Sequence, residues 1–351
     1  MNLFKKNFVI LIGLICLLLI SIILAVSIGS VNIPKGDVYT IITHKILGIN
    51  GLENTIDPSF IDIVWQIRFP RVLLGVIVGS GLALCGVVMQ GTVQNPLADP
   101  YILGISSGGT LGATFAMLMV SSITTISSSY FSISFCAFLG ALIAAIMVFR
   151  LSSIGGRITP VKLILSGIVV NLICTAFSSL MIYMTNDNGE TRIVMDWTMG
   201  SLTSGKWDNI LVPFIVVLLG TVFFQTQFRV MNTMLLGDEA AVTLGIDLHK
   251  YRKIYLVVIS ILTGVIVANC GIIGFIGLVI PHITRSLVGT DHKINLHVSM
   301  LIGAIFLVWA DVLARIILKN MEMPIGIITA IIGAPFFMYI MIKRTYTFGE
   351  R

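Results

Sequence analysis

The charged residues that could do chemistry are concentrated in residues 232–253, between two long apolar segments. Asp238 and Glu239 stand together, Gly245 follows, and a basic run leads into the next apolar segment. Acidic side chains are favourable at the positive end of a helix, and glycine commonly ends one. The stretch therefore predicts a short helix from Asp238 to Gly245, either an ordinary connector or a contact for a soluble partner. A predicted apolar patch accompanies it, formed by Leu244, Ile246 and Leu248.

The remaining polar residues show no pattern typical of a catalytic, nucleotide-binding or metal-binding site. Residues 200–207 nearly match the phosphate-binding pattern G-x-x-x-x-G-K-[ST], but Trp207 replaces the hydroxyl residue that would bind magnesium. The spacing of His282 and His292 fits no zinc motif. Ser106 and Ser107 lack a neighbouring base. We therefore predict a chain that is not an enzyme and that binds no metal, nucleotide or other cofactor itself.

Ionisable residues are sparse in the apolar segments. Asp311 and Arg315 are four residues apart, which predicts mutual neutralisation on one helix face. Asp99 and Asp311 both fall at expected helix ends, whereas ion-coupled transporters usually need such groups at mid-membrane. An ion-coupled secondary transporter is therefore the less favoured alternative from another functional class.

The composition indicates a membrane protein. The chain has 351 residues, of which 56% are hydrophobic and 11% charged, against about 25% charged residues in soluble domains. Apolar runs recur that are long enough to cross a hydrocarbon layer of roughly 30 Å. We predict an all-α polytopic transmembrane bundle that forms a single domain over residues 1–351. The net charge of +6 comes from cations at helix ends, so it does not suggest nucleic-acid binding.

Ten membrane spans are expected. They lie near residues 8–29, 70–90, 99–120, 131–150, 160–184, 210–227, 254–271, 275–289, 298–317 and 325–342. The eighth is short and contains Pro281. Most of the Lys and Arg residues lie on one side if both termini are cytoplasmic, as the positive-inside rule requires. Two ridges of small residues predict close helix packing: Gly104, Gly108 and Gly112 in the third span, and Gly75, Gly79 and Ala83 in the second.

Four blocks of sequence carry a resemblance to a known family. The first comprises RFPR at 68–71, GVVMQ at 86–90, NPLADP at 95–100 and LGISSG at 103–108. The second is LGDEAAVTLG at 236–245, and the third is GIIGFIGLVIPH at 271–282. The fourth comprises ADVLAR at 310–315, EMPIG at 322–326 and GAPF at 333–336. Over essentially its whole length the chain resembles the permease subunits of type II ABC importers for iron–siderophore complexes, haem and vitamin B12.

The resemblance implies a function and a set of partners. The chain would be a multi-pass protein of the bacterial cytoplasmic membrane that imports an iron(III)–siderophore or a related metal chelate, with haem or cobalamin as the alternative. A second permease chain, identical or paralogous, would complete the pathway. Two ATPase subunits would hold ATP and Mg, and an extracytoplasmic substrate-binding protein would deliver the cargo.

The resemblance also implies roles for individual residues. The loop at about 230–253 would carry the coupling helix that sits in a groove of the ATPase, through Leu236, Gly237, Asp238, Glu239, Ala240, Ala241 and Gly245. Arg68, Arg71 and Arg315 would lie at the outer mouth and bind acidic residues of the substrate-binding protein. Thr159, Pro160 and Val161 would form the inner gate, where the proline departs from the small hydroxyl residues expected there.

Overall fold

The regular elements of this protein are helical in the ranges that the computed structural model describes: residues 3–29, 31–49, 56–120, 130–154, 159–185, 188–318 and 321–343. Within these ranges, seven apolar helices are long enough to cross a membrane, and three more apolar helices are shorter. They account for the ten predicted spans. The long ones are α1 (Leu3–Ser27), α4 (Phe69–Val93), α7 (Tyr130–Ser152), α8 (Pro160–Met184), α10 (Trp207–Thr226), α13 (Leu248–Cys270) and α15 (His292–Ile316). The shorter ones are α5 (Ile105–Phe115), α14 (Ile276–Val288) and α16 (Ile325–Lys343).

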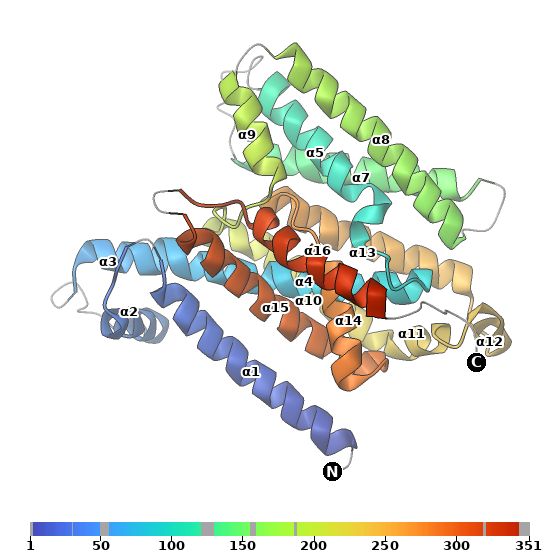
Figure 1. The fold of residues 1–351 in the computed structure, drawn as a ribbon, viewed down its shortest axis with the longest axis horizontal. Coiled ribbons are helices and arrows are strands. Elements are labelled where there is room, and N and C mark those ends of the chain that lie inside the picture. Colours follow the sequence, from blue (N-terminus) through green and yellow to red (C-terminus); the bar gives the residue numbers. More distant parts are fainter. Residues whose placement is uncertain are drawn as a thin grey trace.

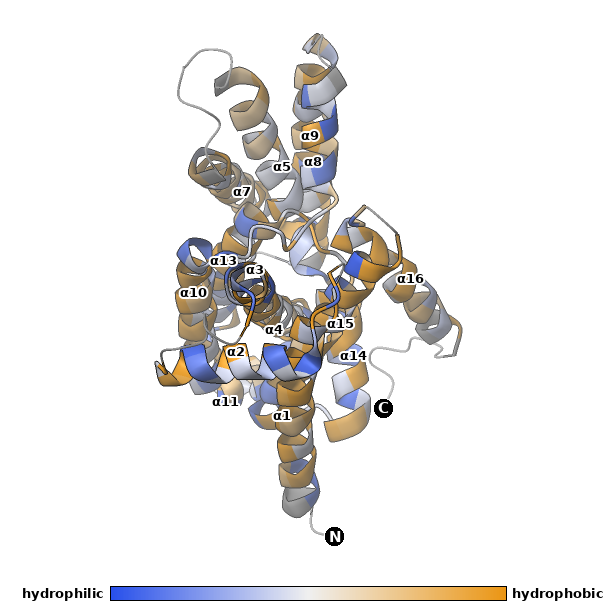
Figure 2. Cartoon of the chain, turned by 90° about the vertical axis from the view of Figure 1, so that its left-hand side faces the viewer, coloured by the Kyte–Doolittle hydropathy of each residue, from blue (hydrophilic) through white to orange (hydrophobic). Residues whose placement is uncertain are grey.

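Short helices lie at both ends of the bundle (Figure 1). At one end are α2 (Lys35–Leu47), α3 (Pro58–Asp62) and η2 (Ile63–Arg68), which continues into α4, and Figure 2 looks onto this end. Toward the opposite end are α11 (Phe228–Met234) and α12 (Asp238–Thr243). Following the predicted orientation, we call the end with α12 the inner end and the other the outer end. Helix α9 (Asn188–Thr198) lies between α8 and α10 in the sequence.

Helix α4 is the centre of the bundle, with nearly all of its residues buried. It packs against α15, α14, α13 and α10. Gly79 allows the closest approach, because a Cβ atom there would lie 2.9 Å from the carbonyl carbon of Gly303 on α15. Gly86 meets α14 in the same way, at 2.5 Å from the Cα atom of Gly277. The predicted small-residue ridge in the second span is thus confirmed as a packing surface.

The third span is not the continuous helix that was predicted over 99–120. It begins as a 3-10 turn, η3 (Pro100–Leu103), whose first amide donates to the side chain of Asp99. Gly104 then adopts φ 68°, a left-handed conformation that interrupts the helix before α5. Gly104 therefore does not belong to the glycine ridge, whereas Gly108 and Gly112 do pack against α7. After α5, the chain continues as the π-helix η4 (Ala116–Val120).

A second interruption lies between α13 and α14. Gly271 and Phe275 both have positive φ, at 67° and 69°. Side chains bond backbone carbonyls of this break: the Tyr101 hydroxyl donates to Ile273 O at 3.1 Å, and Gln90 Nε2 donates to Gly277 O at 3.2 Å. Backbone groups at membrane depth must find partners within the protein. The two polar residues therefore make the predicted short eighth span possible.

Candidate functional site

The predicted inner-end helix is present as α12, which begins at Asp238 and ends before Gly245. Gly237 joins α11 to α12 at φ 96°, and Gly245 leaves α12 at φ 83°. Both conformations are ones that residues with a Cβ rarely adopt. Neither glycine has an atom within 4 Å of where a Cβ would stand, so backbone geometry rather than packing explains these two glycines.

One side of α12 faces the bundle and the other is open. Ala241 is fully buried, whereas Glu239 is exposed. The predicted apolar patch needs correction, because Ile246 packs against the core and Leu248 is buried. Helix α13 begins at Leu248, six residues before the expected start at 254, and turns that side chain inward. The apolar residues exposed around α12 are Leu235, Leu236, Val242 and Leu244.

Two polar contacts join the α12 region to α4. The guanidinium of Arg252, on α13, donates to both carboxylate oxygens of Asp238, at 3.0 and 2.7 Å. Its Nε donates to Thr92 O at 3.1 Å. Gln94, just beyond α4, donates to Met234 O at 2.7 Å. The sequence indicated Arg252 only as part of a basic run next to an apolar segment. Its pairing with Asp238 was missed, because a separation of 14 residues matches no local pairing rule.

A third contact joins α11 to the start of α15. Asn232 donates to Asp291 Oδ1 at 2.7 Å, and its own Oδ1 accepts from the amide of His292 at 2.9 Å. The imidazole Nδ1 of His292 lies 2.8 Å from the same oxygen. His292 therefore anchors the inner end of α15 to α11.

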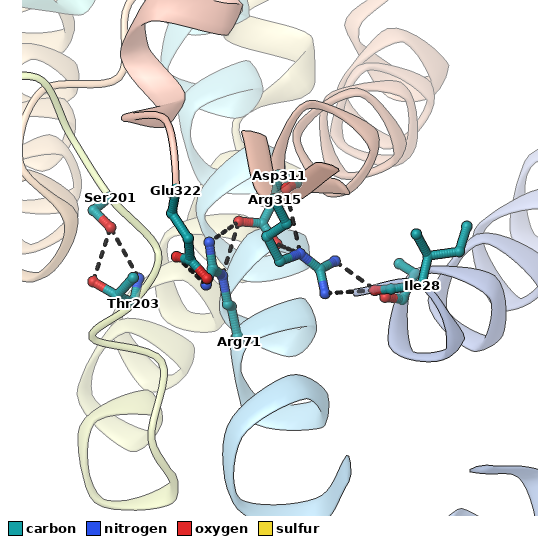
Figure 3. A network of polar contacts seen from close by, with 8 residues as sticks. Ile28, Arg71, Ser201, Thr203, Asp311, Arg315 and Glu322 are labelled. Atoms are coloured by element: carbon teal, nitrogen blue, oxygen red, sulfur yellow. Dashed lines mark hydrogen bonds and ion pairs between the residues drawn. The ribbon is translucent and has the colours of Figure 1, made fainter. Parts of the chain in front are cut away.

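A buried cluster of four charges lies at the outer end (Figure 3). Arg71 contacts Asp311 at 2.9 Å and Glu322 at 2.8 Å, and Arg315 Nε lies 3.1 Å from Asp311 Oδ2. The predicted pair of Asp311 and Arg315 is thus confirmed. We call these four residues the outer charge cluster; its formal charges cancel. Glu322 alone reaches solvent, with 48% of its side chain exposed.

Two of the arginines at this end also bind backbone carbonyls at the carboxyl end of α1 and just beyond it. Arg68 donates to Val26 O at 3.2 Å and to Val31 O, and Arg315 donates to Ala25 O and Ile28 O, each at 3.0 Å. A helix ends in unbonded carbonyls that favour cations.

Arg68, Arg71 and Arg315 thus gather at the outer end, as expected, but they are only 5%, 6% and 7% exposed. All three are bonded within the chain. Their contact with a binding protein stays a prediction.

The predicted gate residues form the start of α8. The hydroxyl of Thr159 accepts a bond from the amide of Lys162 at 3.3 Å, and Pro160 occupies the first helical position, where its missing amide hydrogen costs nothing. Val161 is exposed. Their role as the inner gate stays a prediction.

The loop 200–207, which nearly matches the phosphate-binding pattern, has a structural role at the outer end. The loop 200–207 follows a helix, α9, rather than a strand. A Cβ on Gly205 would lie 2.6 Å from Arg71 Cα, so the loop packs closely on the start of α4. The Ser201 and Thr203 hydroxyls bond to each other at 2.8 Å (Figure 3), and Trp207 Nε1 donates to Trp65 O at 2.9 Å.

Residues 17–343 match the model of the FecCD transport family. The chain belongs to this family. A cobalamin import permease of Halobacterium salinarum is 42% identical over 80% of this chain and 74% of its own length. A permease for Fe(3+)-citrate import in Bacillus subtilis is 39% identical over 85% of this chain and 91% of its own length. A solved inward-facing structure, described as a metal-chelate type ABC transporter, has a TM-score of 0.81, 31% identity, and coverage of 95% of this chain and 99% of that one.

This FecCD protein is accordingly the permease subunit of an ABC importer and a multi-pass protein of the cytoplasmic membrane. ATP is used by a separate ATPase subunit, so the expectation that the permease is not itself the enzyme is confirmed by family membership.

Proposed function

We propose that this permease imports an iron(III)–siderophore or a related ferric chelate. The observation that carries the proposal is the similarity to the ferric citrate permease, which extends over 85% of this chain and 91% of that permease. Haem and cobalamin are the alternatives, since a cobalamin permease is equally similar.

The substrate is tested by deleting the chain and supplying single iron sources. We expect growth to fail on ferric siderophores or ferric citrate and to recover when the gene is restored. Normal growth on every ferric chelate, together with lost use of haemin or cobalamin, would replace the proposed substrate by the corresponding alternative.

We also propose that a second permease chain covers α8 and that the pathway lies between the two. Asn171, Thr175 and Ser179 follow one another at single-turn spacing on α8, and all three are exposed. Polar side chains in a membrane usually face protein or a water-filled cavity rather than lipid. This polar stripe therefore favours a protein or water-filled surrounding over hydrocarbon.

Cross-linking tests the second chain. In a variant without the native cysteines, Thr175→Cys is expected to form a disulfide-linked dimer in membranes, while Phe131→Cys, at an exposed position on α7, is the matched control. Cross-linking of Thr175→Cys no stronger than that of Phe131→Cys would contradict a symmetric pair along this face. A paralogous partner would be identified by mass spectrometry of the linked product.

At the inner end, we propose that α12 is the coupling helix for the ATPase. The support is the exposed acid Glu239 beside the exposed side chains of Leu236, Val242 and Leu244. Glu239→Arg is expected to weaken co-purification of the ATPase. Asp208→Arg makes the same charge change at an exposed outer-end position and serves as the control. Equal ATPase recovery with both variants would exclude α12 as the contact.

At the outer end, we propose that the substrate-binding protein docks around Arg68, Arg71 and Arg315. Glu322, which already binds Arg71, shows that this guanidinium can be reached by a partly exposed carboxylate. Arg71→Glu should weaken docking more at low salt than at high salt, because screening reduces charge effects. Lys206→Glu, at an exposed cation of the same end, is the control, and thermal unfolding verifies that each variant is folded. Unchanged affinity in a folded Arg71→Glu protein would remove the proposed role.

For the inner gate, we propose Thr159, Pro160 and Val161 at the start of α8. Val161 is exposed and can be enlarged without disturbing the core. Val161→Trp is expected to reduce uptake while ATPase association is kept. Uptake at the wild-type rate would exclude this position from the gate.

A further inference from the structure

The buried side chain of Arg252 connects helix α12 to the centre of the bundle. This arginine is only 8% exposed. Two of its nitrogens bind the Asp238 carboxylate on α12, and the third binds Thr92 O on α4. One planar group on α13 thus contacts two other helices, α12 and α4.

The geometry suits arginine specifically. Thr92 is the penultimate residue of α4, where backbone carbonyls have no partner within the helix. A guanidinium presents a rigid fork of donors that can serve a carboxylate with two nitrogens and a carbonyl with the third. Lysine carries the same charge as a single point on a flexible stem, so it cannot hold both partners in a fixed relation.

A second bond connects the same two parts on the other side of Gly237. Gln94 follows α4 directly and donates to Met234 O, which precedes Gly237, whereas Asp238 follows it. The inner end of α4 is therefore bonded to the chain on both flanks of a glycine at φ 96°. A displacement of α12 reaches α4 through these two bonds instead of being absorbed in a free loop.

Helix α4 extends from this contact to the outer charge cluster. Thr92 is near its inner end, and Arg71 is near its outer end. Tight packing against α15 and α14 through Gly79 and Gly86 leaves α4 little freedom to bend between them. A movement of its inner end would therefore shift the helix as one body up to the outer end.

We propose that Arg252 is a positioning residue that transmits the movement of α12 to α4, so that nucleotide-driven motion reaches the outer end of the permease. This inference rests on the proposed role of α12 as the contact for the ATPase. It assigns to Arg252 a function that the coupling helix alone does not provide, because the helix has to be joined rigidly to a span.

The experiment follows the outer end of α4 directly and needs no knowledge of the cargo. Ile67, an exposed residue of η2 two positions before the start of α4, is changed to Cys in a background without native cysteines and labelled with a fluorophore. The complete transporter is reconstituted in nanodiscs, and the signal is recorded with and without ATP and vanadate. Arg252→Lys and Asp238→Asn break the link from its two ends, and Lys253→Gln is the matched control at an exposed neighbouring cation.

We expect the nucleotide-dependent signal to be retained in Lys253→Gln and to fall by about fivefold or more in Arg252→Lys and Asp238→Asn, which is the range of typical coupling between sites. ATPase co-purification should stay near the wild-type level in Arg252→Lys and in Lys253→Gln, neither of which changes a residue of α12. A full signal in both link variants would overturn the proposal. If either variant does not fold, the other decides.

Glu239→Arg separates this inference from the proposed ATPase contact. Loss of ATPase co-purification in Glu239→Arg confirms the contact independently of Arg252. An unchanged level would refute the contact itself, whatever the signal from Ile67→Cys.

Discussion

Replacing Asp311 by Asn should destabilise the permease more than any change at the exposed acid of the same cluster. Asp311 is 1% exposed and lies between two arginines, at 2.9 Å from Arg71 and 3.1 Å from Arg315. The substitution changes the formal charge of the outer charge cluster from zero to +1. Breaking a buried ion pair costs about 3–5 kcal/mol, and since asparagine still accepts a hydrogen bond, we expect about 3 kcal/mol.

The matched comparison is Glu322→Gln, which makes the same chemical change half in solvent. Its ion pair with Arg71 should contribute about 1 kcal/mol or less. Thermal unfolding of the detergent-solubilised protein, followed by tryptophan fluorescence, should show a midpoint loss for Asp311→Asn roughly three times that for Glu322→Gln, as those two free energies imply. Equal losses would refute the conclusion that burial between two guanidinium groups sets the importance of Asp311.

Three further predictions concern glycines. Gly79→Ala should lower the thermal midpoint, because overpacking against α15 reduces the free energy of unfolding by about 1–3 kcal/mol. Gly36→Ala is the control, since a Cβ there has nothing within 4 Å, and similar midpoints for the two variants would contradict the close approach of α4 and α15. Gly29→Ala places a Cβ 2.6 Å from Arg68 Cζ, so it should displace that guanidinium from the end of α1 and lower the free energy of unfolding by about 1 kcal/mol, measured in the same way. A midpoint equal to that of the native protein would count against the arginine cap, the hydrogen bonds by which Arg68 and Arg315 serve the carbonyls at this helix end. Gly245→Ala meets no neighbour, so it should cost only about 1–2 kcal/mol of left-handed strain and weaken ATPase co-purification without unfolding the bundle; global unfolding would show that the position is packed.

The sequence predicted the helical architecture because long apolar runs have few other structures in a membrane. It also predicted α12, since Asp238 and Gly245 are local signals for a helix start and stop. The interruption at Gly104 was missed, because a single glycine in an apolar run is compatible with a continuous helix. The prediction that Leu248 is exposed was wrong because α13 starts earlier than its apolar residues indicate. Its start is set by Asp247, whose side chain accepts a hydrogen bond from the amide of Lys250, and apolar periodicity does not report such a contact.

Contacts between residues far apart in the chain could not be predicted from the sequence, for a different reason. The pair of Asp311 and Arg315 follows from spacing within one helix. The bonds from Arg252 to Asp238 and Thr92 depend on how three helices pack, and no local rule relates such positions. The three outer arginines were assigned to one end correctly, but their burial against α1 and Asp311 could only be seen in the folded chain.

The arginine cap on α1 has a consequence for biosynthesis. Ala25 and Arg315 are 290 residues apart, so the first span enters the membrane long before its second arginine has been made. Until then, Ala25 O and Ile28 O lack their final donor, and the early helix end has to be served by water at the membrane surface. The first span therefore gains its final hydrogen bonds only when the ninth span has been synthesised and packed against it. A ribosome that stalls before residue 315 would leave the carbonyls at the end of α1 without these bonds.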